Sequence, residues 1–288
     1  MARDSTKTKP AKFAGKSQKK AKPLGSWPGN QWLVGQDSVD LTTAKLPANP
    51  LTFDARPQRL TLDVARSAMI VVDMQNDFCA EGGWLDHLGV DFSPNRAPIK
   101  PLTKLIPALR RAGMPIIWLN FGNRPDRLNM TPGDLRLCTP TGDGMGFGDK
   151  LPGSGARVLE KDSWSSAVVD ELKQKPQDIK IDKFRLSGFW GTQLDAILRN
   201  MGVNCLLFAG VNTDVCVMST LQDAQFNGYG CVLIGDCCGT TSPEFCTEAA
   251  IYHVENVYGF VTESRDIISA LKGNDFRESR SVPSSANR

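Results

Sequence analysis

The sequence predicts an α/β fold in which a mostly parallel sheet carries helices on both faces. From residue 60 onward, short runs of β-branched and other apolar residues alternate with stretches that have apolar side chains at helical spacing. Strands and helices that alternate in this way specify a parallel sheet covered on both sides. The apolar fraction of 41% in 288 residues is enough to fill the core of such a Rossmann-like domain.

Each predicted element follows from a local pattern. The run Ala68–Val72 is short and β-branched, as expected of a strand buried on both faces. Further strands are expected at 116–119, 178–182, 205–210 and 231–235. Helices are expected at 98–112, 192–201, 215–227 and 243–256, with Thr192 as an N-cap and Gly113 and Gly228 as stops. Residues 120–165 are rich in Gly, Pro, Asp and Asn and predict a long loop region, which is usually functional in a compact domain.

The chain is predicted to divide into a disordered basic tail (1–45), one α/β domain (46–275) and a flexible C-terminal tail (276–288). Basic residues crowd the first 23 positions, so the net charge of +3 conceals a mildly acidic remainder, and no nucleic acid is expected as a partner. We expect neither a signal peptide nor a membrane span, because no apolar run of suitable length occurs.

Cysteine and histidine usage bears on metals and location. The eight cysteines are irregularly spaced and form no pattern of metal-ligand pairs, and two histidines are too few for a histidine-built zinc site. We therefore expect reduced thiols, a cytoplasmic location and no histidine-built zinc site, and we expect no cofactor.

Three reactive side chains follow three different predicted strands. Asp73 comes directly after the first strand, Lys183 ends the third, and Cys216 lies just beyond the fourth. Ligands of open parallel sheets bind at the carboxyl ends of the strands, so we expect these groups to meet there. A thiol at a helix start beside a lysine is favoured as thiolate, the form that attacks carbonyl carbons.

Each assignment has an alternative. Free cysteines are usually buried as small hydrophobic residues, but the Gly-Val-Asn-Thr-Asp turn before Cys216 favours a nucleophile. Asp77 competes with Asp73 for the acid–base role, although Asp73 abuts the strand end. Lys183 alone could equally form a surface salt bridge.

These motifs resemble those of the isochorismatase-like cysteine hydrolases. The matching segments are VVDMQNDF at 71–78, Lys183 with Ser-Gly-Phe at 187–189, and GVNTDVCV at 210–217. The resemblance covers roughly residues 52–270. Within the superfamily, 82–86 is similar to both ureidoacrylate amidohydrolase and the biuret/triuret hydrolases. Segments 86–89 and 124–126 are closer to the biuret enzymes, and 184–189 is closer to the ureidoacrylate enzymes.

The resemblance implies a triad of Asp73, Lys183 and Cys216, with an oxyanion hole made by the backbone N–H groups of Asn212 and Cys216 and a cis peptide before Asn212. Nicotinamidase-type members hold a metal through an Asp and several histidines. This chain has Asn-Phe-Gly at 120–122 in the matching place, so no metal is expected.

The expected activity is that of a cysteine amidohydrolase that cleaves a small ureide substrate of biuret, triuret or ureidoacrylate type and releases ammonia or an amine. A homo-oligomer, dimer or tetramer, is implied by the resemblance. Phe78, Phe121 and Arg124 are candidates for substrate contact, although Arg124 could instead be a solvated loop residue. The alternatives are a catalytically silent binding or scaffold protein, or an amidase for N-carbamoyl amino acids or nicotinamide.

Overall fold

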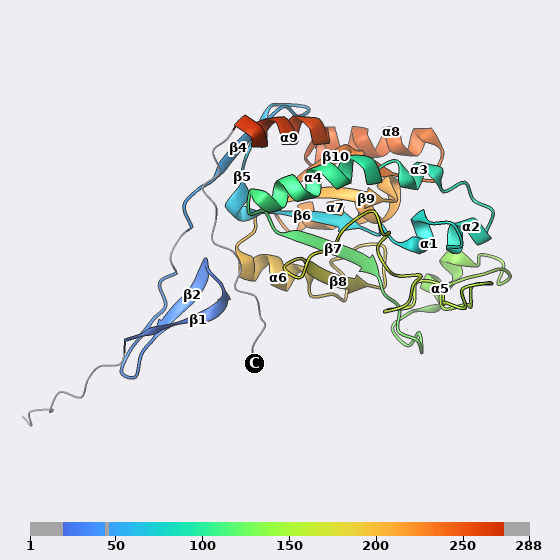
Figure 1. Cartoon of the computed structure of the whole chain (residues 1–288), viewed down its shortest axis with the longest axis horizontal. Coiled ribbons are helices and arrows are strands. Elements are labelled where there is room, and N and C mark those ends of the chain that lie inside the picture. The colour runs from blue at the N-terminus through green and yellow to red at the C-terminus, as the bar shows by residue number, and fades with distance from the viewer. Residues whose placement is uncertain (1–19, 44–45, 274–288) are drawn as a thin grey trace, which may run out of the picture. The chain divides into compact units, whose positions relative to one another are not determined.

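The computed structural model describes residues 20–43 and 46–273 of the chain (Figure 1). The chain divides into two compact units, Met1–Leu46 and Pro47–Arg288. The predicted C-terminal tail and the first 19 residues of the predicted N-terminal tail lie outside the described residues.

The first unit corrects the prediction of a disordered tail up to residue 45. Its described part forms an antiparallel sheet with the order β1-β2-β3, made of β1 (Lys22–Trp27), β2 (Asn30–Val34) and β3 (Val39–Asp40). The first two strands turn at Pro28–Gly29, where Trp27 pairs with Asn30. The prediction weighted the basic composition of the whole segment and did not interpret its Trp, Leu and Val residues as a strand pattern around this turn.

The second unit contains a six-stranded, fully parallel sheet, which confirms the predicted fold class (Figure 1). Its order is β11-β10-β9-β6-β7-β8. The strands are β6 (Ser67–Val72), β7 (Ile116–Phe121), β8 (Ile179–Lys183), β9 (Cys205–Val211), β10 (Gly230–Gly239) and β11 (Phe260–Thr262). The sequence predicted five of these strands and missed β11, together with a hairpin of β4 (Pro50–Phe53) and β5 (Leu60–Asp63).

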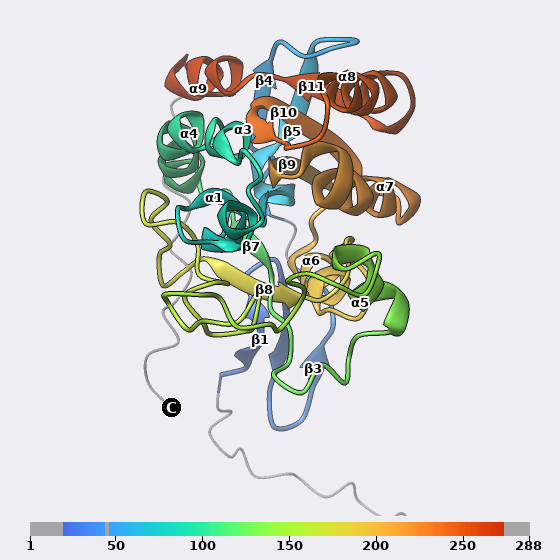
Figure 2. The same cartoon turned by 90° about the vertical axis from the view of Figure 1, so that its right-hand side faces the viewer.

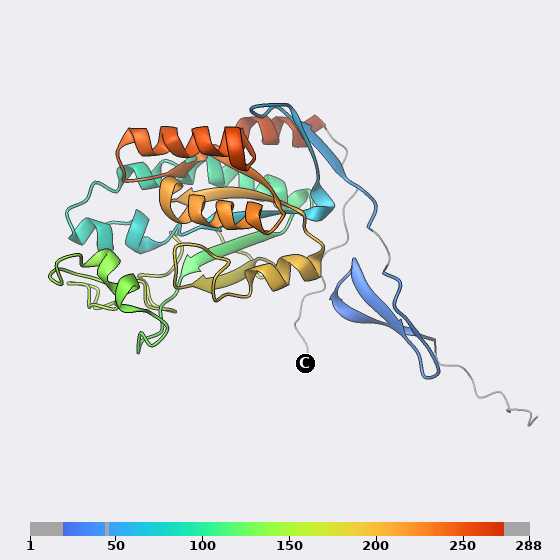
Figure 3. The ribbon, with the colours of Figure 1, turned by 180° about the vertical axis from the view of Figure 1, so that it is seen from behind.

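Helices cover both faces of the sheet. Figure 2 shows α4 (Ile99–Arg111) and α9 (Ser264–Gly273) on one face, and Figure 3 shows α6 (Leu194–Met201), α7 (Met218–Phe226) and α8 (Glu244–His253) on the other. The predicted helices correspond to α4, α6, α7 and α8. A π-helical turn, η2 (Thr213–Val217), leads into α7, and another, η3 (Val254–Tyr258), follows α8. No helix among residues 20–43 and 46–273 combines the length and apolar character that a membrane crossing requires.

The hydrophobic core lies between the central strands and these helices. Every residue of β6 is buried, as the apolar run predicted. The five apolar residues that predicted α4 are buried as well (Ile99, Leu102, Leu105, Ile106 and Leu109). At full burial each such side chain contributes about 1.5–3 kcal/mol to the stability of the fold. This packing therefore holds the strands, and the ends from which the reactive residues follow, in fixed positions.

The region between β7 and β8, which includes most of the predicted loop 120–165, holds one helix, α5 (Pro132–Cys138), and elsewhere consists of turns, bends and isolated β-bridges. Three more short helices lie between β6 and α4: α1 (Asn76–Cys79), α2 (Trp84–His87) and α3 (Ser93–Arg96), while η1 (Val64–Arg66) precedes β6. Apart from η1, these short helices and the loop region follow the carboxyl ends of β6 and β7, so they border the end of the sheet at which the reactive residues were expected.

The close approach of β9 and β6 generates a testable prediction. Gly210 has a φ of 115°, and a Cβ atom there would lie 2.0 Å from the carbonyl oxygen of Val72. Gly210→Ala should therefore lower the free energy of unfolding by about 3 kcal/mol or more, as measured by urea denaturation. The matched control is Gly230→Ala in β10, where the nearest atom lies at 3.6 Å and a change below about 1 kcal/mol is expected. Equal losses in both variants would contradict this account.

Candidate active site

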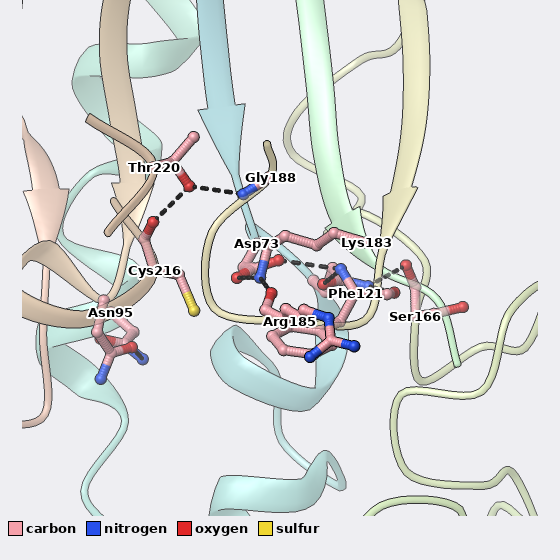
Figure 4. A network of polar contacts seen from close by, with 11 residues as sticks. Asp73, Asn95, Phe121, Ser166, Lys183, Arg185, Gly188, Cys216 and Thr220 are labelled. Atoms are coloured by element: carbon pink, nitrogen blue, oxygen red, sulfur yellow. Dashed lines mark hydrogen bonds and ion pairs between the residues drawn. The ribbon is translucent and has the colours of Figure 1, made fainter. Parts of the chain in front are cut away.

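The three predicted reactive residues lie together at the carboxyl end of the sheet. Asp73 directly follows β6, Lys183 is the last residue of β8, and Cys216 lies in η2 just after β9. The Lys183 Nζ atom lies 2.8 Å from Asp73 Oδ2, and both side chains are almost completely buried (0% and 1% exposed). The alternative of a surface salt bridge for Lys183 is therefore wrong. Cys216 is also buried, and both charged partners are near enough to affect the pKa of its thiol. Figure 4 shows its sulfur on the side of Asp73.

Backbone contacts fix the Asp73 carboxylate. Its residue adopts a left-handed conformation, with φ 49°, which Asp tolerates better than most residues. Its backbone N–H donates to the carbonyl of Leu119 at 3.0 Å, and its Oδ1 accepts from the backbone N–H of Phe121 at 3.0 Å. Both of these partners belong to β7. The carboxylate is thus held by the strand between its own strand, β6, and that of Lys183.

The ammonium group of Lys183 has further partners besides Asp73. It donates to the backbone carbonyl of Arg185 at 3.1 Å, and it lies 3.5 Å from the centroid of the Phe121 ring. An ammonium over an aromatic face is attracted by the ring's electron density. Phe121 therefore contacts both charges, with its N–H on the carboxylate and its ring on the ammonium.

Burial dominates the protonation of the site. It raises the pKa of Asp73, and the charge of Lys183 opposes this effect. Burial likewise raises the pKa of the Cys216 thiol to about 12, again against the lowering effect of Lys183. Burial thus opposes the thiolate that the helix start and the lysine were expected to favour. A thiol that keeps its proton at rest has to lose it as it attacks.

Asp77, the alternative candidate for the acid–base role, makes structural hydrogen bonds. It accepts hydrogen bonds from the N–H groups of Trp84 (3.2 Å) and Leu159 (2.8 Å) and from the Ser165 hydroxyl (2.7 Å). These contacts fasten the long loop to the segment after β6. Asp77 is thus occupied as a structural anchor, and the structure pairs Lys183 with Asp73 instead.

Gln75 is a buried site residue that the sequence reasoning missed. Its amide oxygen accepts from Phe121 N–H at 2.9 Å, and its Nε2 donates to the carbonyls of Phe121 and Ser166 at 2.7 Å each. Gln75 therefore holds the end of β7 against the long loop. The only local signal was its place in the polar run after an apolar strand, which does not reveal burial.

The turn that carries Cys216 is closed by Asn212. The peptide Val211–Asn212 is cis, as the resemblance implied. The Asn212 carbonyl accepts from Val215 N–H and Val217 N–H, each at 3.1 Å. Thr220 then links this turn to the loop after β8, because its hydroxyl donates to Cys216 O at 2.7 Å and accepts from Gly188 N–H at 3.2 Å (Figure 4). The oxyanion role of the Asn212 and Cys216 amides stays a prediction.

The three candidates for substrate contact fall in different places. Phe78 and Phe121 lie in one aromatic cluster with Trp84 and Phe147. The ring centroids of Phe78 and Phe121 are 6.5 Å apart. Arg124 instead forms a two-pronged pair with Asp126, at 2.9 and 2.6 Å, and its side chain is 59% exposed. The structure therefore brings the two phenylalanines to the site and leaves the Arg124 guanidinium bound within its own loop. No group of three or more His, Cys, Asp or Glu side chains in the described part of the chain is arranged to hold a metal ion.

Comparison with known proteins places this arrangement in a family. The model of the isochorismatase domain matches residues 67–266. A cysteine hydrolase from Pseudomonas syringae pv. phaseolicola 1448A is similar in structure, with a TM-score of 0.62, 24% identity, and coverage of 79% of this chain and 99% of that one. An N-carbamoylsarcosine amidase from Thermoplasma acidophilum shows a TM-score of 0.53, 26% identity, and coverage of 69% and 96%. Because the domain model spans more than half of the sequence, the chain belongs to the isochorismatase family.

Proposed function

We propose that this protein is a cysteine-dependent amidohydrolase that cleaves a C–N bond of a small ureide or carbamoyl compound. The observation that carries the proposal is the meeting of a thiol, a carboxylate and an ammonium group in one buried site. The similarity to a carbamoyl amidase at 26% identity supports the substrate class. Biuret, triuret, ureidoacrylate and N-carbamoyl compounds are the candidates.

The first half of the reaction forms a covalent intermediate. Cys216 Sγ adds to the carbonyl carbon while the thiol proton passes to the carboxylate of Asp73. The carbonyl oxygen becomes an oxyanion, which the backbone N–H groups of Asn212 and Cys216 bind. Asp73 then gives the proton to the departing nitrogen, the C–N bond breaks, and ammonia or an amine leaves. A thioester or carbamoyl-thioester on Cys216 remains.

The second half restores the enzyme. A water molecule attacks the thioester carbon, and Asp73 takes one of its protons. The C–S bond breaks, Asp73 returns that proton to the sulfur, and the acid or carbamate leaves. Lys183 keeps Asp73 ionised between these transfers, because a lone carboxylate in so buried a position would hold its proton.

A direct test measures ammonia release from the candidate compounds. Cys216→Ser should lower the rate by more than about 1,000-fold, because loss of the nucleophile removes the covalent route. Cys205→Ser is the matched control, since this free cysteine begins β9, at the end of the strand opposite Cys216, and its rate should stay within about twofold of the original protein. Failure of the unaltered protein to release ammonia from any carbamoyl compound would count against the proposal.

The pH dependence of the reaction tests the role of the ion pair. Asp73 acts as a base only when ionised, so kcat/KM should fall as the pH drops through its pKa, which burial raises above 3.8. Lys183→Gln removes the charge that lowers this pKa, so the residual activity should be lost at a higher pH than in the original protein. Lys180→Gln changes an exposed lysine on the same strand and should leave the acid limb in place. An unshifted acid limb in Lys183→Gln would show that Asp73 does not govern it.

A further inference from the structure

Asn95 is a buried polar residue that the reaction scheme above does not use. It lies in α3, between the aromatic segment at Phe78 and the turn of Asn212, and its side chain is completely buried (0% exposed). Figure 4 draws it beside the network of the triad; in that view the sulfur of Cys216 lies between Asn95 on one side and Asp73 and Lys183 on the other.

The orientation of the Asn95 amide follows from its partners. Its Nδ2 donates to the backbone carbonyl of Phe78 at 3.2 Å and to the side-chain oxygen of Asn212 at 3.3 Å. The reverse orientation would place Asn95 Oδ1 against the Phe78 carbonyl, which can only accept. The contacts therefore assign the nitrogen to these two oxygens and leave Oδ1 facing elsewhere.

The Asn95 Oδ1 atom is buried and has no hydrogen-bond partner. A buried acceptor without a donor loses its contact with water and gains nothing in exchange, so native proteins rarely keep one unless a ligand or a bound water supplies the donor. Its position supports a ligand in the active site. Asn95 contacts Asn212, whose carbonyl closes the turn that carries Cys216, and it contacts Phe78, whose ring neighbours Phe121.

We propose that Asn95 Oδ1 accepts a hydrogen bond from a substrate N–H group. The nitrogen of this group stays bound to the carbonyl carbon, and so to Cys216, after C–N cleavage. This inference rests on the proposed function. A ureide carbonyl carries two nitrogens: one leaves with a proton from Asp73, and the other stays on the carbamoyl-thioester. Asn95 binds that second nitrogen, so the site selects ureides over simple amides, which carry carbon in its place.

Two chromogenic esters isolate this contact. p-Nitrophenyl carbamate and p-nitrophenyl acetate both acylate a thiol and release p-nitrophenol, and they differ in NH2 against CH3 on the retained side. The ratio of their acylation rates, measured in single turnover with the Cys216→Ser rate subtracted, reports the N–H contact alone. Asn95→Leu keeps the size of the side chain and removes the acceptor. It should lower the carbamate-to-acetate ratio by at least about fivefold, and Asn95→Ala should do the same.

The control and the contrary outcomes separate a binding role from a structural one. Ser67→Ala removes another buried hydrogen bond, from Ser67 Oγ to Asp63 O at 2.7 Å, at the opposite end of β6, and it should leave the ratio unchanged. If the Asn95 variants lower both rates together, or leave the ratio unchanged, Asn95 is only structural and the inference is overturned. If neither ester gives Cys216-dependent release, the proposed function itself fails, and the inference fails with it.

Discussion

The site is organised around the buried ion pair of Lys183 and Asp73. Two charges out of water are costly, and each needs further polar contacts to be retained. The carboxylate has the Phe121 N–H, and the ammonium has the Arg185 carbonyl and the Phe121 ring. Removing one charge alone would leave the other uncompensated, at a cost of about 3–5 kcal/mol. The position of β7 between β6 and β8 is therefore a condition for the pair, because one residue of β7 contacts both charges.

The same burial decides where the proton of Cys216 resides. In water a thiol next to an ammonium would lose its proton readily, but here the loss of hydration outweighs that attraction and the pKa rises to about 12. Burial thus disfavours a negative charge on sulfur beside the pair of Asp73 and Lys183. When the sulfur adds to a carbonyl carbon, the negative charge moves to the carbonyl oxygen and does not stay on sulfur. This arrangement protects a buried thiol from unproductive reactions and makes proton transfer part of the attack.

The sequence predicted the sheet and the three reactive residues because both depend on local patterns. Apolar runs mark the strands, and the carboxyl ends of parallel strands lie at one edge, so Asp73, Lys183 and Cys216 could be brought together without coordinates. Burial of polar groups is not a local property, so the same reasoning missed Gln75 and Asn95 and did not foresee that burial raises the pKa of the Cys216 thiol. It also left open whether Arg124 contacts substrate or is a solvated loop residue, and could not show that an aspartate two residues away binds its guanidinium. The sheet of β1–β3 was missed because composition concealed a short strand pattern.

The polar residues 73–77 after β6 have two kinds of role: one belongs to the reactive triad, and the others hold the structure around it. Asp73 points to Lys183, whereas the next three polar side chains bind the backbone of distant segments: Gln75 contacts Ser166, Asn76 contacts Trp164, and Asp77 contacts Leu159. An irregular loop cannot satisfy its own backbone groups as a helix or strand does, so its buried part needs side chains from elsewhere. The loop after β7 is thereby held against the same strand end that presents the reactive carboxylate. It follows that substitutions along this run should affect the shape of the site even where they leave the triad intact, and that the loop and the triad form one structural unit.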